Sequence, residues 1–122
     1  MTGGEHKNLI HDLEERSFKF ARDIRRYIGS LPVSLSKKED AVQLIKSSGS
    51  VGANYIEANE SLDKKEFLMR LRISREEAKE SALLLRLLND SGDGPSPEGE
   101  RLYSEAIELK KIFSTIIETL KE

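Results

Sequence analysis

Residues 64–88 of the chain are "KKEFLMRLRISREEAKESALLLRLL", a stretch in which apolar and small side chains recur every four and three residues in alternation. The row that they form is Phe67, Leu71, Ser74, Ala78, Ser81, Leu85 and Leu88. Such spacing places the row on one face of an α-helix, which at 1.5 Å per residue spans roughly 40 Å. A helix this long must cover its apolar face against other elements, which indicates a helical bundle.

Three further segments carry similar rows, in residues 6–30, 36–59 and 97–121. The rows comprise Leu9, Leu13, Ser17, Phe20, Ile24, Tyr27 and Leu31; then Ala41, Leu44, Ser48, Val51 and Tyr55; and finally Leu102, Ala106, Leu109, Phe113, Ile116 and Leu120. No alternating pattern of period two, typical of strands, occurs between them. The sequence therefore predicts one domain over residues 1–122, an all-α, antiparallel up-down-up-down four-helix bundle.

Local signals mark the ends of these helices. Pro32 ends the first, and Ser36 with Glu39 forms a capping-box pattern that predicts the start of the second. Asn59, which tolerates the left-handed conformation, predicts the end of the second helix. Asp63 is the expected N-cap of a helix over residues 63–90, and "NDSGDGPSP" (89–97) is the expected loop before a fourth helix that Ser96 caps.

Composition excludes several classes of protein. The 122 residues are 34% charged and 37% hydrophobic, which suits helices with one narrow buried face and a charged exterior. The chain has no cysteine, so disulfides and thiolate sites are excluded. No apolar run approaches the roughly 18 residues of a membrane span, and the first residues lack a signal-peptide core. We expect a cytoplasmic protein without membrane contact.

Small residues concentrate in "SSGSVGANYIEANES" (47–61), although Ser, Gly and Asn are weak helix formers. One interpretation places Ser48 and Gly52 on the inward face, where small side chains let the second and third helices approach closely. The alternative is that Ser47, Ser50 and Asn54, on another face, meet a partner subunit or a ligand.

The third helix carries more apolar surface than one row requires. Leu83, Leu84 and Leu87 flank the row, and Ile112 and Ile117 do the same on the fourth helix. A helix that is apolar around most of its circumference is covered on more than one side. Self-association is the expected way to cover it.

The stretch over residues 47–88 also resembles a known family. The Ser/Gly run followed by "ANYIEAN" (53–59), "KKEF" (64–67) and "RISREEAKES" (72–81) are similar to the bacterial four helix bundle proteins, also called ribosomal-RNA intervening-sequence proteins. The resemblance implies an antiparallel four-helix bundle, a bacterial origin and assembly as a homopentamer. It implies no established enzymatic activity and no agreed cellular role. A protein of similar fold that binds nucleic acid is strongly basic, whereas this chain has a net charge of −2. The resemblance therefore does not imply nucleic-acid binding for this chain.

Two strips of basic residues are candidate phosphate contacts. The first comprises Lys19, Arg22, Arg25 and Arg26, and the second includes Lys64, Lys65, Arg72, Arg75 and Lys79. Repeated around an oligomer, either strip would form a ring of positive charge. Acidic residues lie within one helical turn of many of these cations, however, and local pairing would remove much of that charge.

The sequence offers little catalytic chemistry. His11 with Glu14 and Glu15 could supply metal ligands, but a di-iron bundle needs two Glu-x-x-His motifs and carboxylates from all four helices. A nucleophile triad and a phosphate-binding glycine loop are both missing from the sequence. The predictions are therefore no catalytic residues, no cofactor and no metal. The leading hypothesis is a non-enzymatic homo-oligomeric scaffold or interaction protein; the alternative is a nucleic-acid-associated accessory protein that uses the basic strips.

Overall fold

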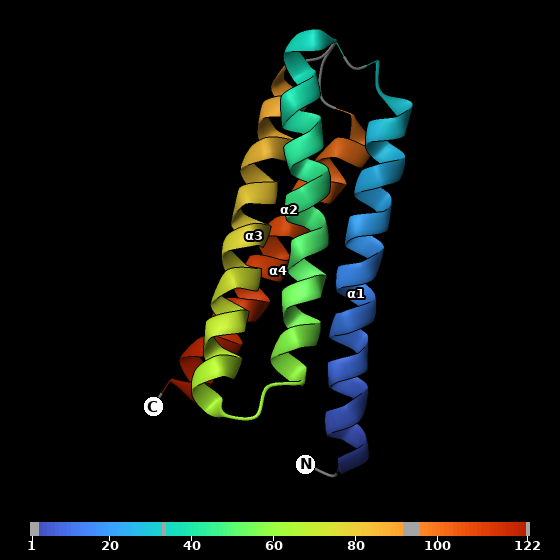
Figure 1. Ribbon diagram of the computed structural model, residues 1–122. Helices are drawn as coiled ribbons and strands as arrows, with labels where there is room; N and C mark the ends of the chain where they lie inside the picture. Colours follow the sequence, from blue (N-terminus) through green and yellow to red (C-terminus); the bar gives the residue numbers. More distant parts are fainter. Residues whose placement is uncertain (1–2, 33, 92–95, 122) are drawn as a thin grey trace.

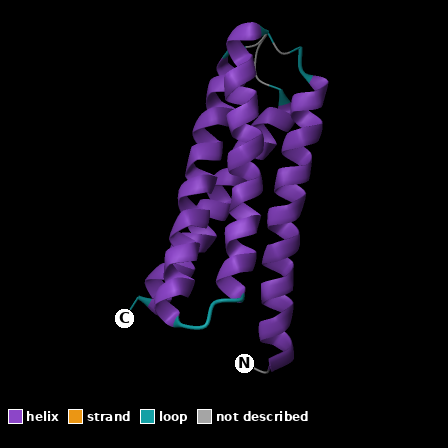
Figure 2. Cartoon of the chain, in the orientation of Figure 1, coloured by secondary structure: helices purple, strands orange, loops and turns teal. Residues whose placement is uncertain are grey.

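The computed structural model describes residues 3–32, 34–91 and 96–121, with side chains in α1 from Leu9 onward. The described residues form four helices and no strand: α1 (Gly3–Ser30), α2 (Leu35–Asn59), α3 (Lys64–Asp90) and α4 (Pro97–Leu120). Figures 1 and 2 show them running alternately up and down. The predicted all-α four-helix bundle is confirmed, and the helix bounds differ from the predicted ones by at most three residues.

Each helix contacts the two helices that precede or follow it around the bundle. The α2–α3 pair is the most extensively packed, and the α1–α4 pair is the least. The chain ends at α1 and α4 both lie at the lower end in Figure 1, as an even number of antiparallel helices requires. The bundle therefore has one loosely closed side, between its first and last helices.

The core lies along the common axis of the helices. Its largest fully buried side chains include Phe20, Ile24, Leu44, Leu71, Leu85, Leu102, Leu109 and Phe113. Each buried side chain of this kind stabilises the fold by roughly 1.5–3 kcal/mol relative to exposure. The rings of Tyr55 and Phe113 pack 5.7 Å apart with a tilt of 58°, a favourable aromatic arrangement.

Two of the predicted helix starts are confirmed. The Asp63 side chain accepts a hydrogen bond from the Glu66 backbone N–H at 2.8 Å, and Ser96 Oγ accepts one from Gly99 N–H at 3.0 Å. The predicted cap of α2 is wrong. Ser34, in extended conformation, is the N-cap, and the helix begins at Leu35. Ser36 lies inside the helix because Ser34 already occupies the N-cap position. The hydroxyl oxygens of the two serines lie 3.0 Å apart.

The role predicted for Asn59 also needs correction. Asn59 is the last residue of α2, but the cap residue Glu60 has φ −98° and ψ 2°, so the helix does not end in a left-handed turn. The Asn59 amide instead donates a hydrogen bond to Glu14 Oε1 at 3.1 Å. The side chain therefore connects the end of α2 to α1.

The small residues of α2 serve two different contacts. Ser47, predicted to lie on another face, is buried against α3, where its hydroxyl lies 2.8 Å from Ser81 Oγ. The prediction that Gly52 faces α3 is also wrong, because a Cβ placed on Gly52 would lie 3.3 Å from Ser17 Cβ of α1. Gly52 therefore allows α1, rather than α3, to approach α2.

The other small residues predicted on the inward faces of α2 and α3 are buried. Ser74 donates a hydrogen bond to the Val51 carbonyl at 2.9 Å across the two helices. Ser48 is buried and donates to the carbonyl of Ile45 at 3.1 Å, within its own helix. Hydroxyls that bond to backbone carbonyls can be buried without leaving a polar group unpaired, so serine is compatible with this tight contact.

Candidate functional site

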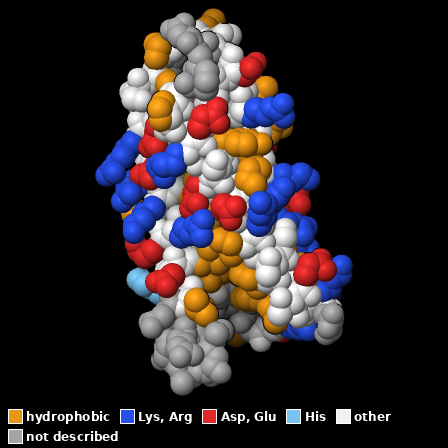
Figure 3. Space-filling view, turned by 180° about the vertical axis from the view of Figure 1, so that it is seen from behind, with side chains coloured by type: hydrophobic (Ala, Val, Ile, Leu, Met, Phe, Trp, Pro, Cys, Tyr) orange, Lys and Arg blue, Asp and Glu red, His pale blue; other side chains and the backbone are white. Residues whose placement is uncertain are grey.

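An apolar groove opens at the lower end of the bundle. Seen from behind, hydrophobic side chains gather in a hollow in the lower half of the molecule (Figure 3). The cavity has a volume of about 810 Å³. Its apolar lining comprises Leu9, Ile10, Leu13, Tyr55, Ala58, Leu62, Phe67, Ile112, Ile116 and Leu120.

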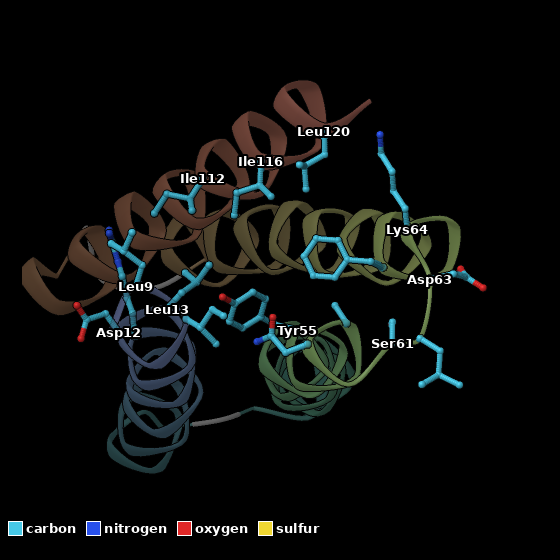
Figure 4. Close-up of a pocket in the computed structure, with 16 residues that line it drawn as sticks. Leu9, Asp12, Leu13, Tyr55, Ser61, Asp63, Lys64, Ile112, Ile116 and Leu120 are labelled. Carbon is cyan, nitrogen blue, oxygen red and sulfur yellow. The ribbon is translucent and has the colours of Figure 1, made fainter. Parts of the chain in front are cut away.

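The groove exists because α1 and α4 are apart at this end. Leu9 and Leu13 of α1 lie across the opening from Ile112 and Ile116 of α4 (Figure 4). Arg16 closes the upper margin through a bidentate ion pair with Glu105, whose two contacts are both 2.7 Å long. Below that ion pair, the apolar side chains of the two helices are left facing an unfilled space.

A second α1–α4 connection lies higher on the same side. The Arg101 guanidinium bonds Asp23 Oδ2 at 3.0 Å and Glu98 Oε1 at 2.6 Å. Burial tends to raise the pKa of Asp23, but hydrogen bonds from Arg22 and Arg101 outweigh it and hold the pKa below its ordinary value. Charged contacts thus supplement the sparse apolar packing between α1 and α4.

The polar groups of the groove lie at its rim and at its base. Asp12, Asp63 and Lys64 are exposed at the rim. Tyr55 lies deeper, and burial raises the pKa of its hydroxyl above the ordinary tyrosine value. A neutral phenol among aliphatic side chains makes this a surface for apolar contact.

Sequence reasoning missed the groove, since it assigned Leu9, Ile116 and Leu120 to buried rows. In the structure Leu9 is 55% exposed, while Ile117 rather than Ile116 is buried in the core. One sequence signal was present. Leu62 is an isolated large apolar residue in the link between α2 and α3, and it is 97% exposed beside the groove.

The predicted basic strips lie largely beside carboxylates or carbonyls. On α1, Arg22 and Arg26 approach Asp23 at 3.0 and 3.9 Å, and Arg25 donates to the carbonyls of Ala21 and Ile45. On α3, Glu76 lies 3.4 Å from Arg75 and 3.9 Å from Lys79.

The two strips also include Lys19, Lys64, Lys65 and Arg72, and all four side chains are exposed. The two strips lie on different helices, and local pairing reduces the charge that either presents to a phosphate backbone.

The candidate subunit contacts on α2 and α3 range from buried to exposed. Leu84 is buried against the core, which corrects its assignment to a surplus surface. Leu83 and Leu87 are 57% and 47% exposed. Ser50 and Asn54 are half-buried: the Asn54 amide donates to the Ser50 carbonyl at 2.9 Å, and Asn54 Oδ1 accepts from Arg70 at 3.2 Å.

The part of the chain that the structure describes contains neither a cluster of metal ligands nor a membrane span. Within residues 3–32, 34–91 and 96–121, no group of three His, Asp or Glu side chains is arranged to hold a metal ion. None of the helices in this part of the chain is both long enough and apolar enough to cross a membrane.

Comparisons with known proteins place the chain in a family. A crystal structure of a protein of unknown function from Bacteroides thetaiotaomicron, in the S23 ribosomal protein family, shares the fold with a TM-score of 0.76. The two sequences are 24% identical, and the match covers 86% of this chain and 97% of that one. The comparison with curated proteins found no significant match. The model of the 23S rRNA-intervening sequence proteins matches residues 11–115, so the chain belongs to the 23S rRNA-intervening sequence protein family.

Proposed function

We propose that this chain acts in the cytoplasm without catalysis, as a homo-oligomeric helical scaffold or interaction protein. Five subunits is the number that the family resemblance implies. The observation that carries the proposal is the groove of about 810 Å³ between α1 and α4, whose lining is mostly aliphatic and aromatic. An exposed apolar surface of this kind is costly in water and is typical of an interaction site.

The exposed apolar side chains outside the groove support the same proposal. Large hydrophobic residues are exposed on two neighbouring helices: Val42 and Ile56 on α2, and Met69, Leu83 and Leu87 on α3. A single exposed leucine needs no explanation, but a groove together with several exposed residues on a small domain favours association. Closed symmetric assembly of identical chains is the commonest form of such association.

The proposal is tested by size-exclusion chromatography with light scattering on the full chain at micromolar concentration. The expected mass is a multiple of 13.8 kDa, and five chains are expected in the particle. A stable species of 13.8 kDa across the concentration range would overturn the assembly.

A further inference from the structure

Leu83 and Leu87 form an exposed apolar ridge on α3, one helical turn apart. Several charged side chains lie within one turn of Leu83. Glu80 accepts a hydrogen bond from Gln43 at 3.4 Å, and Lys79 lies 3.9 Å from Glu76. Arg86 is exposed and makes no ion pair with the described side chains. The ridge therefore combines two leucines with one available cation.

The groove provides the complementary combination. It is a hollow lined by aliphatic side chains, and it has charged residues at its rim. Arg16 forms an ion pair with Glu105. Asp12, on the α1 side of the rim, is exposed and has no ion-pair partner among the described side chains. Lys64 and Asp63, which carry opposite charges, lie at the far end of the groove (Figure 4).

The ridge and the groove of one copy cannot meet. Phe67 marks the part of α3 that lines the groove, and Leu83 lies sixteen residues farther along the same helix. At 1.5 Å per residue this is roughly 24 Å along a rigid axis. Any contact between the two surfaces must therefore join two copies.

We propose that Leu83 and Leu87 of one copy dock into the α1–α4 groove of a second copy, with Arg86 placed against Asp12. This inference rests on the proposed homo-oligomer and names its contact. Because the two surfaces are different, the contact is head-to-tail and each copy uses both of its surfaces. A two-fold contact of groove against groove would leave both ridges in water, whereas a head-to-tail contact buries ridge and groove alike and can close into a ring.

A mixing experiment tests this contact. Leu83→Glu places a charge on the ridge, and Leu9→Glu places one in the groove; both positions are more than half exposed, so both variants should fold. Circular dichroism checks folding. Each variant alone is expected to be a monomer of 13.8 kDa by light scattering. An equimolar mixture should form a dimer and nothing larger, because one intact ridge and one intact groove remain between the two chains.

Phe18→Glu is the matched control, because Phe18 is 59% exposed but lines neither surface. This variant should keep the wild-type mass. If the wild type is itself a monomer, the proposed function fails and the contact fails with it. If the wild type is oligomeric but the ridge variant still assembles alone, or the mixture stays monomeric, only the head-to-tail contact is wrong.

A charge exchange tests the orientation independently. Arg86→Glu and Asp12→Lys should each weaken assembly at low salt, since each places like charges together. The double variant Arg86→Glu/Asp12→Lys should restore it, with the two charges exchanged. Additive weakening in the double variant would overturn the pairing of Arg86 with Asp12.

Discussion

At the scale of single residues, Gly99 shows how one missing side chain preserves a polar cluster. The Tyr27 hydroxyl donates to Asn89 Oδ1 at 2.8 Å and lies 3.2 Å from Ser96 Oγ. A Cβ at position 99 would lie 2.5 Å from the Tyr27 hydroxyl and would collide with the Asn89 carboxamide. We expect Gly99→Ala to lower the free energy of unfolding by roughly 1–3 kcal/mol in urea melts, although alanine is the better helix former.

Gly29 is the matched control for this effect. It is also helical, but beyond its own stretch of helix backbone nothing lies within 4 Å of the position where its Cβ would be. Gly29→Ala should therefore leave the free energy of unfolding unchanged or raise it by up to about 1 kcal/mol. If the Gly99→Ala variant is as stable as Gly29→Ala, the side chains around Tyr27 can rearrange without lowering the free energy of unfolding.

At the scale of the helices, the contact between α1 and α2 depends on Gly52. Gly52 faces Ser17, so Gly52→Leu should force α1 away from α2 and destabilise the protein by roughly 1–3 kcal/mol. Thermal and urea melts measure the loss. In a double-mutant cycle, Ser17→Gly should recover part of it, because the replacement removes the Cβ that the new side chain meets.

Ser74→Gly provides the comparison on α3. Ser74 is buried against the Val51 carbonyl, on the other side of α2. Its replacement should add to the cost of Gly52→Leu without any coupling. Coupling to Ser74 in place of Ser17 would mean that the small residues of α2 approach α3 at this level.

At the scale of the whole molecule, the charged contacts between α1 and α4 make stability depend on pH. Asp23 has a folded-state pKa below its ordinary value of 3.8, so folding favours its ionised form. The resulting stabilisation is complete above the unfolded pKa and is lost as the pH falls below 3.8 through the lower folded-state pKa. Asp23→Asn should lower the urea midpoint at neutral pH and flatten the acid side of the stability profile.

Glu15→Gln is the control, because Glu15 is exposed on the same helix, lies outside the groove and does not contact Arg101. The urea midpoints of both variants are measured from pH 7 to pH 3. An Asp23→Asn profile that parallels the wild type over the whole range would show that this contact does not stabilise the bundle.

The sequence by itself determined the four helices and most of the core. Apolar periodicity and side-chain caps are local properties of the chain, so Asp63 and Ser96 mark the starts of α3 and α4 without knowledge of the rest of the fold. The row that includes Leu71 and Leu85 was assigned correctly for the same reason, and both side chains are completely buried.

Only the tertiary structure decided what the small residues contact and where the site lies. Ser47 and Gly52 carry little apolar signal, so periodicity could not tell the α3 side of α2 from the α1 side. The groove depends on the separation of α1 and α4, two helices far apart in sequence, and no local pattern specifies that distance. Leu9, Ile116 and Leu120 repeat like core residues, but they line a groove because the opposite wall is too far away to cover them.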